Sequence, residues 1–182
     1  MWYNQSVEAW RAKGGRTLVI ELTVYSILYS LLSRHRVVLL KEVEGDSFLP
    51  IWIGTNEAEA IAMRLQGAQV PRPMTHDLLL NVITQLGAAV QYIVVNDLRS
   101  NTFYARIAVQ MDGVQQLIDS RPSDAIALAV RASVPIYVEQ GVMDKAGIGI
   151  SPEIREQVNE SDDQLDVFRD FVDSLDLDGL GD

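Results

Sequence analysis

Alternating apolar and polar side chains dominate the chain between residues 17 and 53, and this is the periodicity of β-strands. We expect strands at 17–28, 36–43 and 48–53, with Glu44-Gly45-Asp46 forming the second turn. The first segment follows three basic residues and therefore also resembles the start of a secretory signal. Glu21 interrupts its apolar run and no small-residue cleavage site follows, so we interpret the segment as a strand.

Two helical segments follow these strands. The first is expected at about 56–66, with Thr55 or Asn56 as its N-cap and Gly67 as its C-terminal stop. Pro71-Arg72-Pro73 then blocks helix formation, and Thr75 is expected to cap a second helix that ends at Gly87. The apolar residues that share one face of this second helix are Leu78, Leu79, Val82, Ile83 and Leu86.

Residues 90–119 show the clearest topological signal in the chain. Strands at 90–98, 102–111 and 114–119 are separated by short turns, and Asp112-Gly113 is a strong two-residue hairpin sequence. A helix is expected from Ser120 to about residue 132, then a strand at 136–139 and a short helix at 141–146. Strands in runs favour an α+β fold with a mostly antiparallel or mixed sheet, including a three-strand meander over 90–119.

The pattern divides the chain into a main domain and two appendages. Residues 1–16 show no clear period and are interpreted as a loose extension, and residues 17–148 form the domain. Residues 149–182 are interpreted as an acidic linker followed by one amphipathic helix. The apolar face of that helix consists of Leu165, Phe168, Val172 and Leu175.

The net charge of −10 is unevenly distributed along the chain. Residues 153–182 hold 11 acidic and two basic side chains, whereas residues 1–152 hold 14 acidic and 13 basic ones. The main domain is therefore close to neutral and lacks the broad positive charge that nucleic-acid-binding proteins usually carry. Any site for an anion has to be local.

Several classes of chemistry are excluded by what the sequence lacks. It contains no cysteine, so disulfides, thiol nucleophiles and cysteine-bound zinc are impossible, and two histidines cannot build a histidine-rich metal site. The common glycine-rich phosphate loops and the zinc-protease and serine-hydrolase motifs are also missing. No segment reaches the roughly 20 uncharged apolar residues of a membrane span. We expect a cytoplasmic protein without an organic cofactor.

The first candidate site is the turn Arg72-Pro73-Met74-Thr75-His76-Asp77. An arginine beside a helix N-terminus suits an anion, because free backbone N–H groups and the helix dipole both favour negative charge. His76 could transfer protons near neutral pH, and Asp77 could bind a metal or orient a water molecule. In the alternative interpretation Thr75 caps the helix, Asp77 complements its dipole and the prolines only shape the turn.

The second candidate site is Asp119-Ser120-Arg121-Pro122-Ser123-Asp124, at a strand-to-helix junction. Asp119 and Asp124 could hold Mg²⁺ or Mn²⁺ while Arg121 neutralises a phosphoryl oxygen. The alternative is a capped helix in which Arg121 forms an ion pair with Asp119 or Asp124. Glu57, in the first turn of the helix at 56–66, is interpreted only as a complement to the helix dipole.

Five segments occur together in the order and spacing of a known family. They read VLLKE (38–42), LPIWIG (49–54), PRPMTHDLL (71–79), TFYA (102–105) and DSRPSDAIAL (119–128). The chain resembles the bifunctional nuclease (BFN) domain family from about residue 19 to residue 147, and residues 1–18 lie outside the family pattern. The resemblance implies an α+β fold, a homo-oligomer and cleavage of both RNA and DNA with little sequence preference.

The preferred hypothesis is therefore a nuclease assisted by a divalent metal ion. In it Arg72, Arg121 and Ser123 bind phosphate, Asp119 and Asp124 hold Mg²⁺ or Mn²⁺, and His76 transfers a proton, with Asp77 also in a catalytic role. The alternative is a non-catalytic oligomeric module that binds a small anion, a nucleotide or a partner protein, and the neutral domain favours it. The acidic C-terminal helix is a further candidate for docking on a partner protein.

Overall fold

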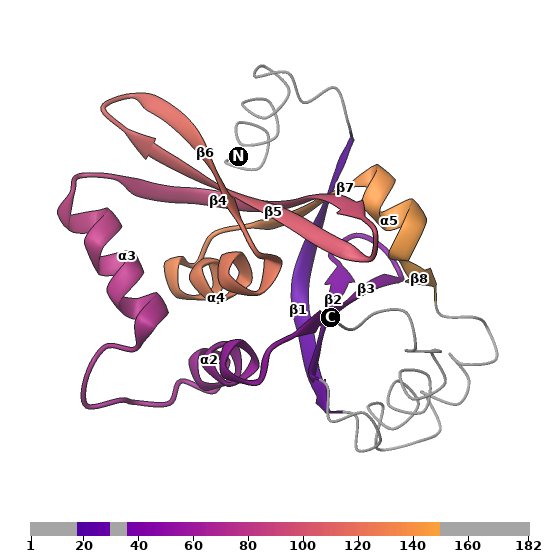
Figure 1. Ribbon diagram of the computed structural model, residues 1–182, viewed down its shortest axis with the longest axis horizontal. Helices are drawn as coiled ribbons and strands as arrows, with labels where there is room; N and C mark the ends of the chain where they lie inside the picture. Colours follow the sequence, from indigo (N-terminus) through magenta and orange to yellow (C-terminus); the bar gives the residue numbers. More distant parts are fainter. Residues whose placement is uncertain (1–17, 30–35, 150–182) are drawn as a thin grey trace.

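The computed structural model describes residues 18–29 and 36–149 (Figure 1). The predicted extension at 1–16 and the predicted C-terminal helix lie outside the described residues. The strands are β1 (Val19–Tyr29), β2 (Arg36–Glu42), β3 (Ser47–Ile53), β4 (Ala89–Arg99), β5 (Thr102–Met111), β6 (Val114–Ser120), β7 (Ile136–Glu139) and β8 (Ile148–Gly149). The helices are α2 (Thr55–Leu65), α3 (Thr75–Gln85), α4 (Pro122–Ala132) and α5 (Gln140–Ala146).

All of these strands belong to one mixed sheet, in the order β6-β5-β4-β7-β1-β2-β3-β8. Neighbouring strands are antiparallel except for β4 and β7, which pair in parallel. Their parallel pairing is possible because β5, β6 and α4 lie between them in the chain and return it to the same side. The α+β prediction is confirmed, and so is the assignment of the first apolar segment to a strand.

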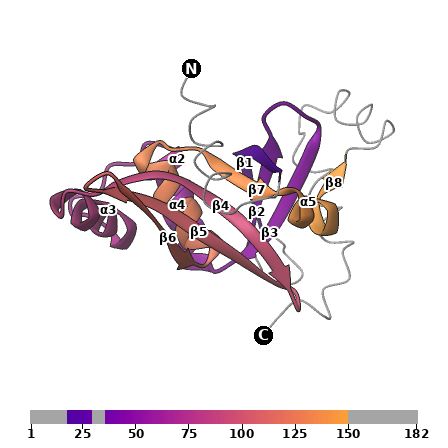
Figure 2. The same ribbon diagram turned by 90° about the horizontal axis from the view of Figure 1, so that it is seen from above.

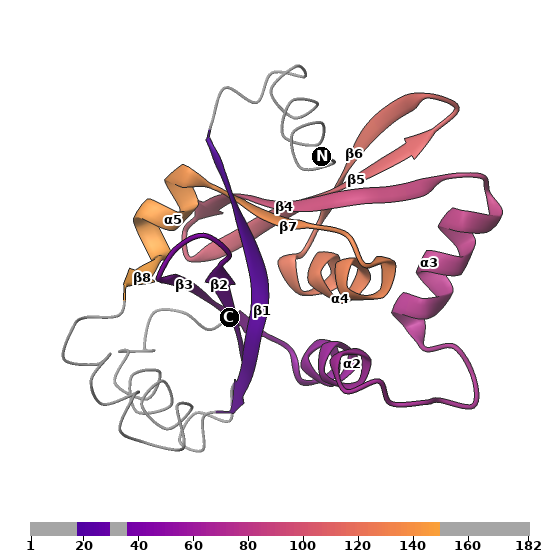
Figure 3. The ribbon, with the colours of Figure 1, turned by 180° about the vertical axis from the view of Figure 1, so that it is seen from behind.

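The sheet is strongly twisted, and this places the two groups of strands around α4. Figures 1 and 3 show β1, β2 and β3 crossing the direction of β4, β5 and β7, with α4 in the angle between the two groups. Bulges accentuate the bend, because each adds one unpaired residue and increases the local twist. They interrupt the pairing between Val24 and Ser26 of β1 and at two positions of β4.

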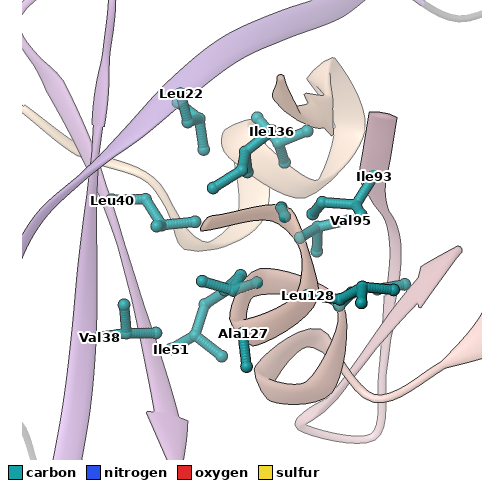
Figure 4. Packing of buried hydrophobic residues seen from close by; sticks show 14 of the residues in the cluster. Leu22, Val38, Leu40, Ile51, Ile93, Val95, Ala127, Leu128 and Ile136 are labelled. Atoms are coloured by element: carbon teal, nitrogen blue, oxygen red, sulfur yellow. The ribbon is translucent and has the colours of Figure 1, made fainter. Parts of the chain in front are cut away.

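The core forms where α4 meets both groups of strands. Figure 4 shows Ala127 and Leu128 of α4 between Leu40 and Ile51 on one side and Ile93 on the other. The alanines of α4 leave little side-chain bulk, so the helix can approach the strands closely, and Ala125 through Ala129 are all buried. The remaining helices lie at the periphery, and Figure 2 places α3 and α5 at opposite ends of the molecule.

The predicted meander is confirmed as β4, β5 and β6, joined by two tight turns. Asp112 and Gly113 both adopt positive φ, at 50° and 75°, which a two-residue hairpin of the observed kind requires. Ser100 and Asn101 also have positive φ in the β4–β5 turn, at 46° and 60°. Both turns therefore lie where the sequence predicts them.

The helix boundaries differ slightly from the predicted ones. Thr75 does not cap α3 but is its first residue, and the N-cap is Met74, just as Gly54 rather than Thr55 or Asn56 caps α2. Gly67 and Gly87 follow the two helices with φ of 65° and 77°, which confirms them as C-terminal stops. β8 has only two residues and is too short to show a period in the sequence.

Most of the apolar face predicted for α3 points away from the core, and of its five residues Ile83 alone packs inward. Leu78, Leu79, Val82 and Leu86 are 57%, 40%, 45% and 70% exposed, whereas Leu80 and Ile83 pack against the core cluster. The helix carries apolar residues on two sides, and the narrower side, with Leu80 and Ile83, faces α4. Among the described helices, none has the length and apolar character needed to cross a membrane.

Candidate functional site

A buried arginine fixes the relative positions of α2, α3 and α4. The side chain of Arg131, in α4, is 4% exposed and donates to Asp77 Oδ1 of α3 at 2.6 Å. It also donates to the carbonyl oxygen of Ala127 at 2.9 Å and to that of Ala60 in α2 at 3.0 Å. A desolvated guanidinium needs such partners, so these contacts hold the start of α3 against α4.

Asp77 uses both carboxylate oxygens within the fold. Its Oδ2 accepts a hydrogen bond from the backbone N–H of Met74 at 3.0 Å, while Oδ1 accepts from Arg131. Burial raises the pKa of Asp77, but the hydrogen bonds from Met74 and Arg131 and the nearby positive charges outweigh burial and leave the pKa below its ordinary value. The structure therefore accounts for Asp77 as the residue that orients the first turn of α3.

The neighbouring residue, His76, links the two candidate sites at 72–77 and 119–124, which we call the two Arg-Pro turns. Its Nε2 lies 3.1 Å from Oδ1 of Asp124, and the two side chains are 10% and 29% exposed. Nδ1 of the same ring has no hydrogen-bond partner among the described residues. A histidine held by a carboxylate at one ring nitrogen can accept a proton at the other, which has no described partner here.

Asp124 is held in turn by Arg121, the N-cap residue of α4. The guanidinium donates from Nε to Oδ2 at 2.7 Å and from Nη2 to Oδ1 at 3.0 Å. Burial raises the pKa of Asp124, but the hydrogen bonds from Arg121 and His76 outweigh it and bring the pKa below its ordinary value. Of the two ion pairs considered for Arg121, the structure contains the one with Asp124.

Arg121 also binds Glu57, a contact that no local sequence pattern predicts. Its Nη2 donates to Oε1 of Glu57 in α2 at 2.9 Å. The two carboxylates raise the pKa of Arg121, and Nη1 keeps no hydrogen-bond partner among the described residues. His76, Asp124, Arg121 and Glu57 therefore form one chain of contacts across the first turns of three helices, which we call the His76–Asp124 network.

A pocket of about 320 Å³ opens beside the network at the N-terminus of α4. Ile53 of β3 and Phe103 of β5 form part of its wall, and Arg121 and Ser123 line it from α4. Ser123 is only 7% exposed, and its hydroxyl group has no hydrogen-bond partner among the described residues. The first turn of α4 also lacks a side-chain cap, so backbone N–H groups remain available there. We call this hollow the Arg121 pocket.

Arg72 lines a different pocket, of about 310 Å³, between α2, the loop that follows it and α3. Arg64, Asp77 and Arg131 line this Arg72 pocket as well. The sequence hypothesis gave Arg72 and Arg121 the same role, binding phosphate. The structure brings the turns together through His76 and Asp124, while their two arginines line separate pockets.

Asp119 lies apart from the other candidate residues. Strand residues alternate between the two faces of a sheet, so Asp119 shares a face with Leu117 of β6, which packs on the side opposite α4. The structure therefore does not bring Asp119 to Asp124. Within residues 18–29 and 36–149, no group of three histidine or acidic side chains is placed so that it could hold a metal ion.

Sequence reasoning missed Glu57, Arg64 and Arg131 as neighbours of the site. Arg131 had a usable signal, since it lies seven residues after Asp124 and therefore on the same face of a helix. Glu57 had none, because its link to Arg121 depends on how α2 and α4 pack. Contacts between helices that are distant in sequence follow from tertiary structure rather than from any local pattern.

The chain matches one family model and several known proteins. The family model of the bifunctional nuclease domain matches residues 38–151. An uncharacterized protein of Mycobacterium tuberculosis is 40% identical over 157 residues, which cover 85% of this chain and 94% of that protein. "Bifunctional nuclease 1" of Oryza sativa subsp. indica is 25% identical over 138 residues, which cover 74% of this chain and 42% of that protein.

"Bifunctional nuclease 2" of Arabidopsis thaliana is 26% identical over 137 residues, covering 72% of this chain and 42% of that protein. The chain thus spans less than half the length of these two plant relatives. The matched region, 38–151, contains all four members of the His76–Asp124 network and both pockets. The chain belongs to the bifunctional nuclease domain family.

Proposed function

We propose that this chain hydrolyses phosphodiester bonds of RNA and DNA with little sequence preference, using His76 and Asp124 as a proton-transferring pair. The contact of 3.1 Å between His76 Nε2 and Asp124 Oδ1 carries the proposal, because it joins two of the five segments on which the family resemblance rests, 71–79 and 119–128. The plant relatives named bifunctional nucleases support the reaction class. Asp124 stabilises the imidazolium that forms when His76 accepts a proton.

The Arg121 pocket supplies the remaining requirements for phosphate binding. Nη1 of Arg121, the hydroxyl group of Ser123 and the N-terminus of α4 all offer donors to a phosphate oxygen. The apolar wall at Ile53 and Phe103 suits the sugar or base of the same nucleotide. Because these contacts bind the backbone and one nucleotide without reading base edges, they agree with weak sequence preference.

In the proposed reaction a water molecule attacks phosphorus and gives its proton to Nδ1 of His76. The bond from phosphorus to the leaving oxygen breaks, and that oxygen takes a proton from the imidazolium or from solvent. Arg121 Nη1 and the N-terminus of α4 stabilise the charge that develops on the phosphoryl oxygens. Asp77 has a positioning role, since its ion pair with Arg131 fixes the turn of α3 that carries His76.

That cleavage depends on Mg²⁺ or Mn²⁺ is a prediction separate from the reaction described above. The described residues offer two carboxylates and one histidine in the network, but Arg121 occupies the oxygens of Asp124 and binds Glu57. This donor set does not fit a divalent ion while Arg121 is in place, so no step above depends on a metal. Asp119 stays a catalytic and metal-binding candidate only for a site outside the network.

A binding module without catalysis is the second candidate function. The two carboxylates that neutralise Arg121 favour it, because a phosphate has to compete with them for the guanidinium. The near-neutral charge of residues 1–152 points the same way. Such a module would bind a small anion or nucleotide in the Arg121 pocket and leave it unchanged.

Cleavage of single-stranded RNA and DNA by purified wild type, Asp124→Ala and Asp77→Ala, each with and without EDTA, separates the two functions. We expect wild type to cut both polymers and Asp124→Ala to lose about 10²-fold or more of the rate, the usual worth of a group in proton transfer. Equal cleavage by the three folded proteins would show a contaminating nuclease. Binding of nucleotide without any cleavage by wild type would favour the module.

A further inference from the structure

The Arg72 pocket carries an excess of positive charge that the proposed reaction does not use. Arg64, Arg72 and Arg131 line it together with Asp77 and Asn81. Asp77 is the one carboxylate among the lining residues, and it is bound to Arg131. Arg64 and Arg72 therefore form no ion pair of their own among the described residues, in a domain whose overall charge is close to zero.

The free donors belong to Arg64 and Arg72. With the described part of the chain, Arg64 makes two long hydrogen bonds, from Nε to the Val130 carbonyl oxygen at 3.4 Å and from Nη2 to that of Arg131 at 3.5 Å. Nη1 of Arg64 and the whole guanidinium of Arg72 have no hydrogen-bond partner among the described residues. Each nitrogen of the Arg131 guanidinium already donates one hydrogen bond, to Asp77, Ala127 or Ala60, so Arg131 contributes mainly charge and shape to the pocket.

This pocket lies next to the His76–Asp124 network along α3. His76 contacts Asp124, and the following residue, Asp77, lines the Arg72 pocket. On the other side of Asp124, Arg121 lines the Arg121 pocket. The two pockets therefore flank the one contact to which we assign proton transfer.

We propose that the Arg72 pocket binds a second phosphate group, held by Arg64 and Arg72, beside the phosphate that the Arg121 pocket binds. The choice of a phosphate-bearing ligand rests on the proposed function, whereas the excess positive charge does not. Guanidinium groups bind phosphate oxygens with paired hydrogen bonds, and a pocket of this size admits one phosphate with part of a sugar. The favoured ligand is a strand of at least two phosphodiester groups, and a free phosphate ion shares the same chemistry.

Binding measurements with Arg64→Gln and Arg72→Gln test the site without relying on cleavage. Both side chains lie at the exposed rim, so neither variant threatens the core. Arg106→Gln is the matched control, because it removes one exposed arginine from β5, away from both pockets. The probes are a labelled, phosphorothioate-linked thymidine pentamer, followed by fluorescence anisotropy, and inorganic phosphate, followed by calorimetry.

We expect each pocket variant to bind the pentamer about tenfold more weakly, the usual loss for one charged hydrogen-bonding partner. The slope of log K against log salt should also fall by about 0.7, the value for one lost phosphate contact on a single strand. Arg106→Gln should match wild type in both respects.

Unchanged pentamer affinity and salt slope, together with a lost response to inorganic phosphate, would overturn the strand as the ligand and identify free phosphate instead. Unchanged binding of both probes by both pocket variants would overturn the site. The result is also separable from the reaction, because a wild-type protein that binds through Arg64 and Arg72 but cleaves nothing would contradict the proposed function alone.

Discussion

Asp124 is the residue at which the separate features of the site meet. It accepts hydrogen bonds from His76 and from two nitrogens of Arg121, and through Arg121 it is linked to Glu57. The same carboxylate therefore orients the imidazole of His76 and holds the side chain of Arg121, the N-cap residue of α4. A substitution at this position should change both activity and the response of stability to acid.

The acid response follows from the lowered pKa of Asp124. The unfolded chain, with an ordinary aspartate pKa of about 3.9, takes up the proton first as pH falls. The stabilisation from Asp124 is thus complete above that pH and is lost as pH falls through the lower pKa of the folded state. We expect urea unfolding of Asp124→Asn to show a shallower loss of stability than wild type between about pH 4.5 and pH 2.

Asp112→Asn is the control for this measurement, because its carboxylate lies in the β5–β6 turn and forms no ion pair among the described residues. Its stability curve should run parallel to that of wild type. An equally parallel curve for Asp124→Asn would show that the interactions of Asp124 contribute nothing to folding.

Individual residues of the site were predictable only where they share a local motif. His76, Asp124, Arg121 and Ser123 stood out because they occupy first turns of helices that a proline introduces. The specific pairing of His76 with Asp124 lay outside such reasoning, since the two residues are 48 positions apart. Asp119 looked equivalent to Asp124 in sequence, but the end of β6 turns the two side chains to different faces of the sheet.

Among the elements, α4 is the helix against which both groups of strands and the helices α2 and α3 pack. It packs against both groups of strands through its alanines, and its Arg131 side chain binds α2 and α3. The alanines at 125, 127, 129 and 132 indicate from the sequence alone that α4 can pack closely against its neighbours. The bend of the sheet around it was not visible, because bulges in β1 and β4 and the parallel pairing of β4 with β7 leave no clear local signal.

Arg131→Met should destabilise the fold by about 3 kcal/mol, the lower end of the range for breaking a buried ion pair, because Asp77 stays partly exposed and can be hydrated. Urea unfolding gives the value. In a cycle with Asp77→Asn, the double variant should lose about 1–3 kcal/mol less than the sum of the single variants.

Arg99→Met provides the surface comparison for Arg131→Met. Arg99 also pairs with an aspartate, Asp97, but its side chain is exposed and solvent screens the pair, so the loss of stability should be far smaller than that of Arg131→Met. Additive losses in the Asp77 and Arg131 cycle would contradict the view that this ion pair fixes α3 against α4.

At the scale of the whole molecule, the homo-oligomer that the family resemblance implies stays a prediction, and α3 offers the surface on which to test it. Leu78, Leu79 and Val82 of α3 and its C-cap residue Leu86 are exposed on a face that contacts no described part of the core cluster. We expect sedimentation velocity to show an oligomer for wild type and a smaller species for Leu78→Lys with Val82→Lys, because buried charges oppose association.

Leu65→Lys is the comparison for these substitutions, since Leu65 is an exposed leucine of α2. It should sediment like wild type. A monomeric wild type would contradict the predicted oligomer, and an oligomer that survives both substitutions in α3 would exclude this face from the contact.

The charge pattern of the whole chain agrees with a site that recruits substrate locally. Residues 1–152 are nearly neutral, yet three arginines gather around the Arg72 pocket and a fourth lies at the Arg121 pocket. The sequence could establish the neutrality and the two Arg-Pro turns. It could not show that the first turn packs against α4, the helix that the second turn opens. That contact follows from the packing of three helices inside a bent sheet.

The central claim is that His76 and Asp124 act as one unit in phosphodiester cleavage. The most direct test is the rate constant kcat on a labelled single-stranded RNA for His76→Gln, Asp124→Asn and the double variant, with Arg106→Gln, away from both pockets, as a folded control. We predict losses of about 10²–10⁴-fold for each single variant and little further loss in the double variant. Losses that multiply in the double variant, or single variants as active as wild type, would contradict the claim.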